Sequence, residues 1–472
     1  MSPNILRGWV EGARIAPRLS LALATIVALT MSAPAWAVTD SGPKQPDKRK
    51  IRHAGQKRQN RSTSHEAARS GALPFVPPLT TRSPLGLTAS VDTKGVTLKG
   101  DDNLPELVIG GRVNLDASAG SLRPRSIGPA LSDNAELRRA WLEPTLKLPN
   151  GIIANLQYDF SETDQPVNNA LIAYRGLEPF IFTVGNFKEP FSLDQLIANN
   201  NTLFAERSLL DTFAPARDFG ASVGTHGDRW TAVAGVFGGN INTDLAENGI
   251  AGTARLTYAP ILTDQEVLHF GVAGSYRKLD ESDTALSFSS APEDNLAASN
   301  LVDTGPLKNA ADVGRFGLEA LYQNGGGRIQ AEYTLTTVGE RGGGVARVFH
   351  AGYIQAAYVL NGNGPDYKLV PPHGSEYAVL GGVKVPDDAR VSNGGAGVFE
   401  FGARLSAITL ESGSVRGGTE LNGTLGVNWY PDHNIRLMAD YVRAHAAPVA
   451  SSVLLDGEAD SNLFIGRLQF YW

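Results

Sequence analysis

The chain has 472 residues, no cysteine, 52 glycines, a hydrophobic fraction of 42% and a formal net charge of −6. The absence of cysteine excludes a disulfide framework and a thiolate metal site, and it agrees with passage through an oxidising compartment. Abundant glycine with modest hydrophobicity is typical of many short strands and loops, half of whose side chains face water.

The first 37 residues have the pattern of a secretion signal. Arg7, Arg14 and Arg18 precede an apolar stretch from Leu19 to about Met31, and Ala35-Trp36-Ala37 supplies small residues at the two positions that a signal peptidase reads. We predict cleavage after Ala37. The stretch is too short to be a good membrane span, and no later segment reaches the length that a transmembrane helix needs. If the chain crosses a membrane, it does so with strands.

Residues 38–80 form a basic lead-in with almost no apolar side chains. Residues 38–70 carry nine basic and three acidic residues, whereas residues 71–472 carry 30 basic and 44 acidic ones, a net charge of −14. The lead-in cannot build a core, so we expect it to be disordered. Two interpretations are open for it, a solvated tether and a site for an anionic partner, and we favour the tether.

From Leu107 onward, apolar and polar residues alternate with a period of two, as the wall of a membrane barrel requires. Leu156, Tyr158 and Phe160, for example, would face lipid, and the polar residues between them would face the lumen. Although the length would ordinarily suggest about three domains, we predict an all-β chain in which residues 81–472 form one transmembrane antiparallel β-barrel. Its sixteen strands start near residues 107, 137, 152, 168, 179, 219, 229, 251, 267, 314, 328, 351, 398, 419, 434 and 462.

The connections between these strands support an even count. They are mostly short after even strands, as at Pro149-Asn150-Gly151, and mostly long after odd strands, as at residues 187–218 and 277–312. Short turns on one side and long loops on the other are typical of outer-membrane barrels. Residues 361–397 break the pattern, because they are long and follow an even strand. They form either a periplasmic or lumenal excursion or a further hairpin, which would make eighteen strands.

The last ten residues, Leu463 to Trp472, read as a strand that ends in Phe470-Tyr471-Trp472. An aromatic-terminated strand at the carboxyl end of a chain with a secretion signal indicates the outer membrane of a Gram-negative bacterium. This location excludes most of the functions that soluble proteins perform.

Three motifs stand between residues 184 and 220: VGNFKEPFSL at 184–193, FAERSL at 204–209 and FAPARDFG at 213–220. This order resembles the phosphate-selective porin O/P family, whose members carry GQFKEPFSLE-like, FMER-like and FAPGR-like runs. Further similar runs are ELRRA at 136–140, LVDTG at 301–305, and LGVNWY at 425–430 with NIRLM at 434–438. One departure is LNGNGPDY at 360–367, which stands where family members often have a TGESRPY-like run, and the −14 charge of residues 71–472 fits poorly with phosphate selectivity.

The resemblance implies a trimeric outer-membrane porin with sixteen strands, whose third external loop folds into the lumen and narrows it. It places Lys188, Arg207 and Arg217 at or near this constriction. Because Glu189 and Glu206 adjoin two of these residues, the alternative is that the charges pin the loop to the wall. Neither interpretation is favoured over the other.

Alternation also separates the charges that would face the lumen. The inward acidic residues are Asp116, Glu143, Asp159, Glu319, Glu332, Glu400 and Asp440. The inward basic residues outnumber them by four and are Arg112, Arg139, Lys147, Arg175, Arg255, Arg277, Arg315, Arg328, Arg404, Arg436 and Arg467. A lumen lined with guanidinium groups would attract phosphate oxygens, although pairing with wall carboxylates for stability could account for about half of these residues. Acidic external loops could share divalent cations with the headgroups of outer-membrane lipid and lipopolysaccharide.

Other functions fit less well. His226 and His269 have no serine or acidic partner that spacing identifies, so no catalytic site, metal site or cofactor is expected. A sugar-selective porin would need a run of inward aromatic residues, and the candidates are few: Trp141, Phe187 and Tyr353. We therefore predict a passive porin that favours small anions such as phosphate or polyphosphate, with no nucleic-acid partner. A general or cation-preferring porin and a sugar-selective porin remain the alternatives.

Overall fold

The computed structural model describes residues 79–82, 87–92, 95–101, 103–123, 134–243, 249–280, 286–297, 300–447 and 458–472. The predicted signal peptide, residues 1–37, lies outside the described residues. So does the basic lead-in, apart from its last two positions. The fold below is that of the chain from residue 79 onward.

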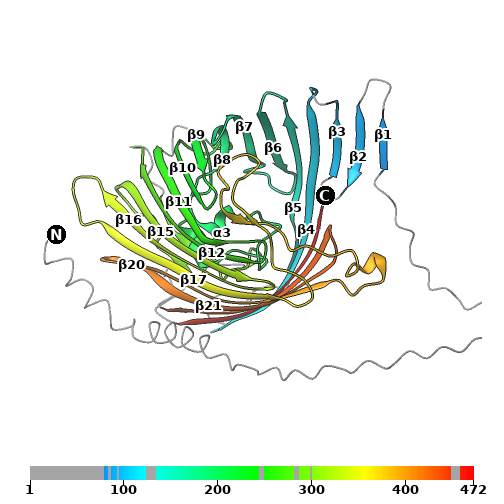
Figure 1. The fold of residues 1–472 in the computed structure, drawn as a ribbon. Coiled ribbons are helices and arrows are strands. Elements are labelled where there is room, and N and C mark those ends of the chain that lie inside the picture. The colour runs from blue at the N-terminus through cyan, green and yellow to red at the C-terminus, as the bar shows by residue number, and fades with distance from the viewer. Residues whose placement is uncertain are drawn as a thin grey trace, which may run out of the picture. The chain divides into compact units, whose positions relative to one another are not determined.

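Sixteen antiparallel strands form a closed barrel (Figure 1). The first and last strands pair with each other from Asp460 opposite Arg123 to Tyr471 opposite Arg112, which closes the ring. The predicted all-β fold and the count of sixteen are therefore confirmed. The strands are β4 (Glu106–Arg123), β5 (Asn134–Lys147), β6 (Ile152–Asp159), β7 (Val167–Leu177), β8 (Phe180–Lys188), β9 (Arg217–His226), β10 (Trp230–Phe237), β11 (Ile250–Leu262), β12 (Glu266–Lys278), β15 (Ala310–Asn324), β16 (Gly327–Glu340), β17 (Arg347–Val359), β20 (Val398–Ser412), β21 (Val415–Asp432), β22 (Ile435–Ala447) and β23 (Ala459–Tyr471).

Apolar and polar residues that alternate in the sequence lie on opposite faces of the barrel wall. Along β6, Leu156 and Tyr158 are exposed on the outer surface, while Gln157 and Asp159 are buried inside. Apolar side chains can cover the outside because every backbone group in a closed ring has a partner on a neighbouring strand. The same in-and-out pattern runs along β11, from Ile250 to Ala259.

The two rims of the barrel differ in the length of their connections. One rim, here called the turn end, carries the short turns at residues 148–151, 178–179 and 325–326, and also the start of β4 and the end of β23. The other rim, the loop end, carries most of the longer connections. Residues 189–216 are loop 3, and residues 279–309 are loop 5.

Residues 360–397 leave from the turn end, and they are here called the long turn. They hold a small separate hairpin, β18 (Tyr367–Lys368) with β19 (Val379–Leu380), and the 3-10 turn η4 (Val391–Asn393), none of which pairs with a wall strand. Since β17 pairs directly with β20, no further hairpin enters the wall and eighteen strands are excluded. The long turn is an excursion into the lumen, where its backbone oxygens at Pro371 and Pro372 accept hydrogen bonds from the inward Arg175.

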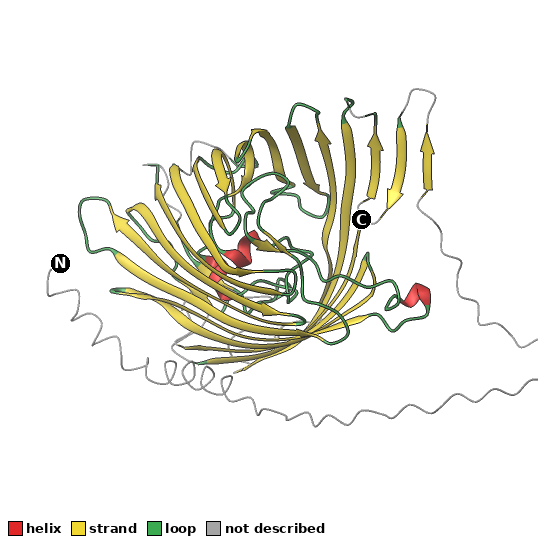
Figure 2. Cartoon of the chain, viewed as in Figure 1, coloured by secondary structure: helices red, strands yellow, loops and turns green. Residues whose placement is uncertain are grey.

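Loop 3 also folds into the lumen, as predicted. It contains the short helix α3 (Leu193–Leu196), which lies inside the ring of strands in Figure 2, and the 3-10 turn η3 (Leu209–Thr212). Phe213 of loop 3 packs against Phe288 of loop 5 and stacks on Phe349 of the wall. Loop 5 carries its own short pair, β13 (Ser289–Ser290) with β14 (Val302–Asp303). The two loops share one apolar cluster with the inner wall, which fixes them in the lumen.

Three further strands lie before the barrel: β1 (Leu79–Arg82), β2 (Thr88–Asp92) and β3 (Gly95–Lys99). They form a meander, and β3 pairs with the first residues of β4, from Val96 opposite Ile109 to Lys99 opposite Glu106. The later part of β4 pairs with β23 instead. The wall strands thus begin at Glu106, and residues 79–99 extend the sheet beyond the barrel.

In the described part of the chain, no helix has the length and apolarity needed to cross a membrane.

Candidate functional site

Loop 3 lies against one side of the lumen, where wall side chains take up its backbone hydrogen bonds. Arg436 on β22 donates to the carbonyl oxygens of Thr202 (2.7 Å) and Leu203 (3.1 Å). On the same strand, Asp440 accepts from the backbone N–H of Ala205 at 2.7 Å. A loop without regular structure needs such partners once it is removed from water, so these contacts set where the lumen narrows.

The predicted constriction residue Lys188 ends β8 and is only 3% exposed. Its ammonium group donates to the carbonyl oxygens of Leu196 (3.2 Å) and Ile197 (3.3 Å), at the end of α3. It also forms an ion pair of 3.4 Å with Glu376 of the long turn. Lys188 therefore joins the wall, loop 3 and the long turn.

Arg207 contacts the same helix end from within loop 3. Its guanidinium donates to the carbonyl oxygens of Asp194 (2.9 Å) and Ile197 (2.8 Å) and to the side chain of Asn199 (2.6 Å). The last turn of a helix leaves carbonyl groups without hydrogen-bond donors, and the side chains of Arg207 and Lys188 supply these donors. Both residues thus pin the loop, while their charges remain at its centre.

Arg217 differs from the other two in its ion pairing, because Lys188 pairs with Glu376 and Arg207 lies 4.0 Å from Asp211. The guanidinium of Arg217 donates to Asn169 at 2.9 Å and to Gln157 at 3.4 Å, and it lies 6.0 Å from the ring of Trp141. Among the described residues, no carboxylate oxygen lies within 4.0 Å of it. Its positive charge is therefore compensated only from a longer distance, by Glu376 and Glu143.

The side of the lumen that faces loop 3 is lined by polar residues, here called the polar wall: Arg112, Asn114, Arg139, Trp141, Glu143, Asn155, Gln157 and Asn169. Arg112 lies 4.2 Å above the ring of Trp141 and 3.7 Å from Glu143. One terminal nitrogen (Nη1) of Arg112 and one of Arg139 are buried without a hydrogen-bond partner among the described residues. These are donors that an incoming acceptor could use.

The charges of loop 3 and the polar wall act on one another. Four basic residues lie close enough to interact electrostatically with Arg207: Arg112, Arg139, Lys188 and Arg217. The three predicted constriction residues are therefore brought together, and two wall arginines join them.

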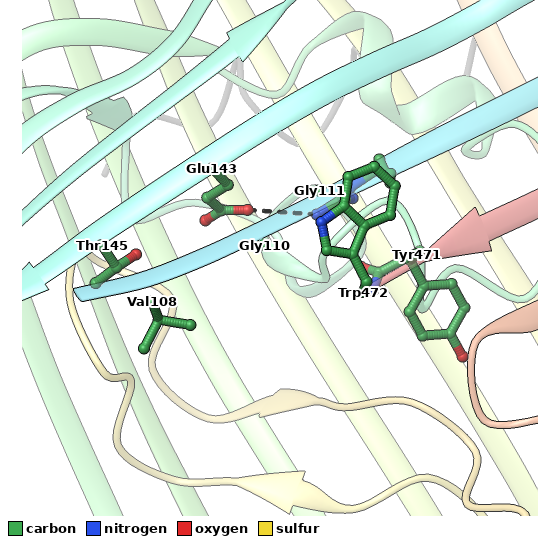
Figure 3. A pocket seen from close by; sticks show the side chains of 9 residues that line it. Val108, Gly110, Gly111, Glu143, Thr145, Tyr471 and Trp472 are labelled. Carbon is green, nitrogen blue, oxygen red and sulfur yellow. Dashed lines mark ion pairs between the residues drawn. The ribbon is translucent and has the colours of Figure 1, made fainter. Parts of the chain in front are cut away.

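A cavity of about 230 Å³ lies between the polar wall and the tip of loop 3 (Figure 3). Arg112 and Glu143 line it from the wall, Asn200 from loop 3, and Trp472 from the end of the chain. Gly111 permits this arrangement, because a Cβ atom there would come within 2.3 Å of the Trp472 ring. The cavity lies inside the barrel near its turn end, beside the seam that β23 and β4 close.

Two carboxyl groups of loop 3, those of Glu206 and Asp211, have pKa values that are shifted in opposite directions. Burial alone would raise the pKa of Glu206, but the charges of Arg138 and Arg467 outweigh it and hold that pKa well below its usual range. Burial raises the pKa of Asp211 to about 6, opposed by Arg207 and assisted by Asp194. Glu206 is thus fully ionised at neutral pH, whereas Asp211 changes its charge close to it.

A barrel with an inward loop 3 and this set of charges can pass small solutes. Comparison with known proteins shows the family to which this barrel belongs. The model of the family of phosphate-selective porins O and P matches residues 109–472. The chain belongs to this family. The barrel is therefore a channel of the outer membrane, with its turn end periplasmic and its loop end external.

Individual relatives agree with this assignment. Porin O of Pseudomonas aeruginosa is 26% identical over 377 residues, which cover 72% of this chain and 82% of that protein. An uncharacterized protein of Caulobacter vibrioides is 25% identical over 343 residues, 70% of this chain and 67% of that protein. Among solved structures, an anion-selective porin from Comamonas acidovorans has a TM-score of 0.50 at 12% identity, over 78% of this porin and 100% of that chain. This last likeness supports the fold alone.

Five of the eleven inward basic residues of the porin donate hydrogen bonds to the backbone of loop 3 or the long turn. Arg404 and Arg467, like Arg436, donate to carbonyl oxygens of loop 3. Arg255 and Arg175 donate in the same way to the long turn. These side chains position the inserted segments more than they line a water-filled path.

Within the part of the chain that the structure describes, the remaining inward basic residues divide into those with an ion pair shorter than 3 Å and those without one. Arg328 forms an ion pair of 2.6 Å with Glu400, Arg277 pairs with Glu189 at 2.7 Å, and Lys147 pairs with Glu106 at 2.7 Å. Arg315, like Arg112 and Arg139, keeps buried nitrogens that have no hydrogen-bond partner among the described residues. Arg328, Arg404 and Arg436 also keep one such nitrogen each, but they bind Glu400 or loop 3 as well.

Two features of the porin could not be read from sequence spacing. Glu376, the partner of Lys188, lies in the long turn, whose place in the lumen no motif indicated. The two histidines have acidic neighbours that spacing did not identify: His269 lies 3.1 Å from Glu319, and His226 lies 3.5 Å from Glu178. In both cases the partner is brought near by the strands and their turns rather than by a motif. Within the described residues, no group of three or more His, Asp and Glu side chains could hold a metal ion.

Proposed function

We propose that this porin is a passive channel that favours anions, with phosphate or polyphosphate as the preferred class of solute. One observation carries the proposal: Arg112 and Arg139, on the wall that faces loop 3, each keep a buried guanidinium nitrogen that has no acceptor in the described part of the chain. An unpaired buried donor is costly, and an anion or the water that accompanies it would supply the missing acceptor. Membership of the phosphate-selective family agrees with this solute class.

The chemistry needs no covalent step. A phosphate would enter by diffusion and exchange part of its hydration shell for the N–H groups of Arg112, Arg139 and Arg217. Guanidinium groups suit this role, because they present paired donors to phosphate oxygens. The solute leaves again because each contact is weak and several sites share it. The constriction residues Lys188, Arg207 and Arg217 would supply the surrounding positive potential.

The expected cellular setting follows from the same family. We propose that the chain is exported through a signal peptide cleaved after Ala37, that it assembles as a homotrimer, and that it contacts outer-membrane lipid and lipopolysaccharide. Mass spectrometry of the purified protein would give the cleavage site, and its mass in detergent would give the oligomeric state.

The first test is the zero-current potential of the purified porin in a planar bilayer under a KCl gradient, repeated with added phosphate. We expect anion selectivity and block of the chloride current by phosphate. Arg112→Gln combined with Arg139→Gln should weaken the block by phosphate, and neutralising Lys188, Arg207 and Arg217 together should lower the anion preference. If the triple variant keeps its selectivity, those three residues only pin loop 3.

A cation-preferring porin is the second candidate, because carboxylates stand among the same cations. Glu143, Asp159 and Glu376 all interact electrostatically with Arg112. A potential of the opposite sign in the KCl experiment would favour this candidate. A sugar-selective porin has less support, since the three inward aromatic candidates, Trp141, Phe187 and Tyr353, are only 5%, 2% and 5% exposed and offer no open ring for a sugar to stack on.

A further inference from the structure

The first residues of α3 donate hydrogen bonds to a carboxylate on a distant strand of the wall. Glu332 on β16 faces inward and is 6% exposed. One of its oxygens accepts the backbone N–H of Leu193 at 2.9 Å, and the other accepts the backbone N–H of Asp194 at 2.6 Å. The first N–H groups of a helix have no partner within the helix, so Glu332 satisfies two of them at once.

The neighbouring strand holds this carboxylate in place. The hydroxyl group of Tyr353 on β17 donates to Glu332 at 2.6 Å, and Gln330 donates in turn to the oxygen of Tyr353. Both residues are buried. A carboxylate fixed by a third hydrogen bond from a rigid strand can set the position of a loop more accurately than a freely rotating one.

The far end of α3 is where Lys188 and Arg207 attach, through the carbonyl oxygens of Leu196 and Ile197. Only one helical turn separates these carbonyls from the two N–H groups that Glu332 accepts. A shift of the helix start would therefore move the acceptors that hold both cations. The carboxylate on the wall and the cations at the constriction are coupled through this single turn.

We propose that Glu332 is a positioning residue for the constriction: it anchors α3 so that Lys188 and Arg207 stay opposite the polar wall. The part of this inference that concerns selectivity rests on the proposed function. The part that concerns the place of loop 3 does not. The competing explanation is that Glu332 stabilises the barrel and has no effect on where loop 3 lies.

The test follows loop 3 directly and separately from conduction. The chain has no native cysteine, so Ala198→Cys in loop 3 and Ala356→Cys on the outer face of β17 give a clean pair of spin labels. Their distance distribution is measured by pulsed electron paramagnetic resonance in three backgrounds: native, Glu332→Ala and Glu332→Gln. Glu319→Gln is the matched control, because Glu319 is a buried wall carboxylate that binds Arg255 and His269 instead of loop 3.

We expect a narrow distribution in the native background and in Glu319→Gln, a broad or shifted one in Glu332→Ala, and partial recovery in Glu332→Gln, whose amide oxygen can still accept one N–H group. The zero-current potential of Glu332→Ala should fall toward zero, with Glu332→Gln between it and the native protein. If the Ala variant does not fold, Tyr353→Phe provides a milder one, since it removes only the hydrogen bond that orients the carboxylate, and it should broaden the distribution slightly.

The outcomes separate the two proposals. A broadened distribution in a native channel that proves cation-selective would support the positioning role of Glu332 and overturn the proposed function. An unchanged distribution in Glu332→Ala, with only a lower unfolding temperature, would overturn the positioning role, whatever ions the channel passes. If that variant does not fold, an unchanged distribution in both Glu332→Gln and Tyr353→Phe would overturn it.

Discussion

The ammonium group of Lys188 lies 3.4 Å from a carboxylate oxygen of Glu376, and this ion pair joins the end of β8 to the long turn. The exposed fraction is 3% for the Lys188 side chain and 27% for that of Glu376. Although burial opposes it, the charge of Lys188 lowers the pKa of Glu376. Glu376 is therefore ionised at neutral pH and compensates the charge of Lys188.

Replacing this carboxylate should make the channel more selective for anions. In Glu376→Gln the charge of Lys188 is no longer compensated, so we expect a larger anion-to-cation permeability ratio in the KCl gradient. The loss of the pair should lower the free energy of unfolding by about 1–3 kcal/mol. Asp387→Asn is the control, because that carboxylate is 84% exposed in the same turn and far less able to act on the lumen. Equal ratios in the native porin and Glu376→Gln would contradict the placement of Lys188 at the ion path.

The selectivity should also depend on pH through Asp211 of loop 3. Its Oδ1 atom is buried without a hydrogen-bond donor among the described residues, and burial raises its pKa to about 6. A raised pKa keeps the carboxyl group protonated below about pH 6 and ionised above it, so loop 3 gains a negative charge near Arg207 as the pH rises. We expect a higher anion preference at pH 5 than at pH 7.5. In Asp211→Asn this difference should become smaller, while Asp164→Asn, in an exposed loop, should leave it unchanged.

The wall of the barrel was predictable because the two faces of a membrane strand meet different solvents. Leu156 and Gln157 must point to opposite sides, so a period of two in the sequence gives both the strand and the facing of its side chains. The strand count and the inward direction of residues such as Arg255 follow from this local rule. The inserted loop 3 was expected only because its motifs resemble those of a known family.

The hydrogen-bond partners of the inward charged residues were not predictable, since they belong to segments that are distant in sequence. Arg436 faces inward as the alternation requires, but its acceptors at Thr202 and Leu203 belong to loop 3. Arg255 likewise meets Tyr377 of the long turn. No periodicity encodes such contacts, because they arise from how irregular segments fold back onto the finished wall. The roles of Lys188, Arg207 and Arg217 in selectivity stay predictions for the same reason.

A separate prediction concerns the seam that closes the barrel. Arg467 on β23 binds both oxygens of Asp116 on β4, at 2.7 and 2.6 Å, and it also binds Glu206 of loop 3 at 2.8 Å. Arg467→Gln would leave the buried carboxylate of Asp116 without this partner and Glu206 with Arg138 alone among the described residues, so we expect the free energy of unfolding to fall by roughly 3–5 kcal/mol. Thermal unfolding in detergent measures this. Lys147→Gln is the contrast, because its pair with Glu106 is partly exposed and should contribute only about 0–1 kcal/mol. Similar losses of stability in the two variants would contradict the conclusion that the contacts of Arg467 stabilise the barrel more than an exposed ion pair does.

The last prediction concerns the long turn as an obstacle in the lumen. Its base is fixed where Leu360 donates to the carbonyl oxygen of Phe399 at 2.9 Å, so residues 363–396 can be replaced by a Gly-Ser pair without disturbing β17 or β20. We expect a higher single-channel conductance, because the segment that crosses the lumen and carries Glu376 is gone.

The shortened porin should also be less stable, since each buried apolar side chain lost, such as Val379 or Leu380, removes about 1.5–3 kcal/mol of burial. The matched control shortens the external connection at residues 341–346, most of which is exposed, and should leave the conductance unchanged. Single-channel recordings of the two shortened proteins decide the matter. If removal of the long turn leaves the conductance at the native value, ions pass along the polar wall without meeting the turn, and the narrowest point is set by loop 3 alone.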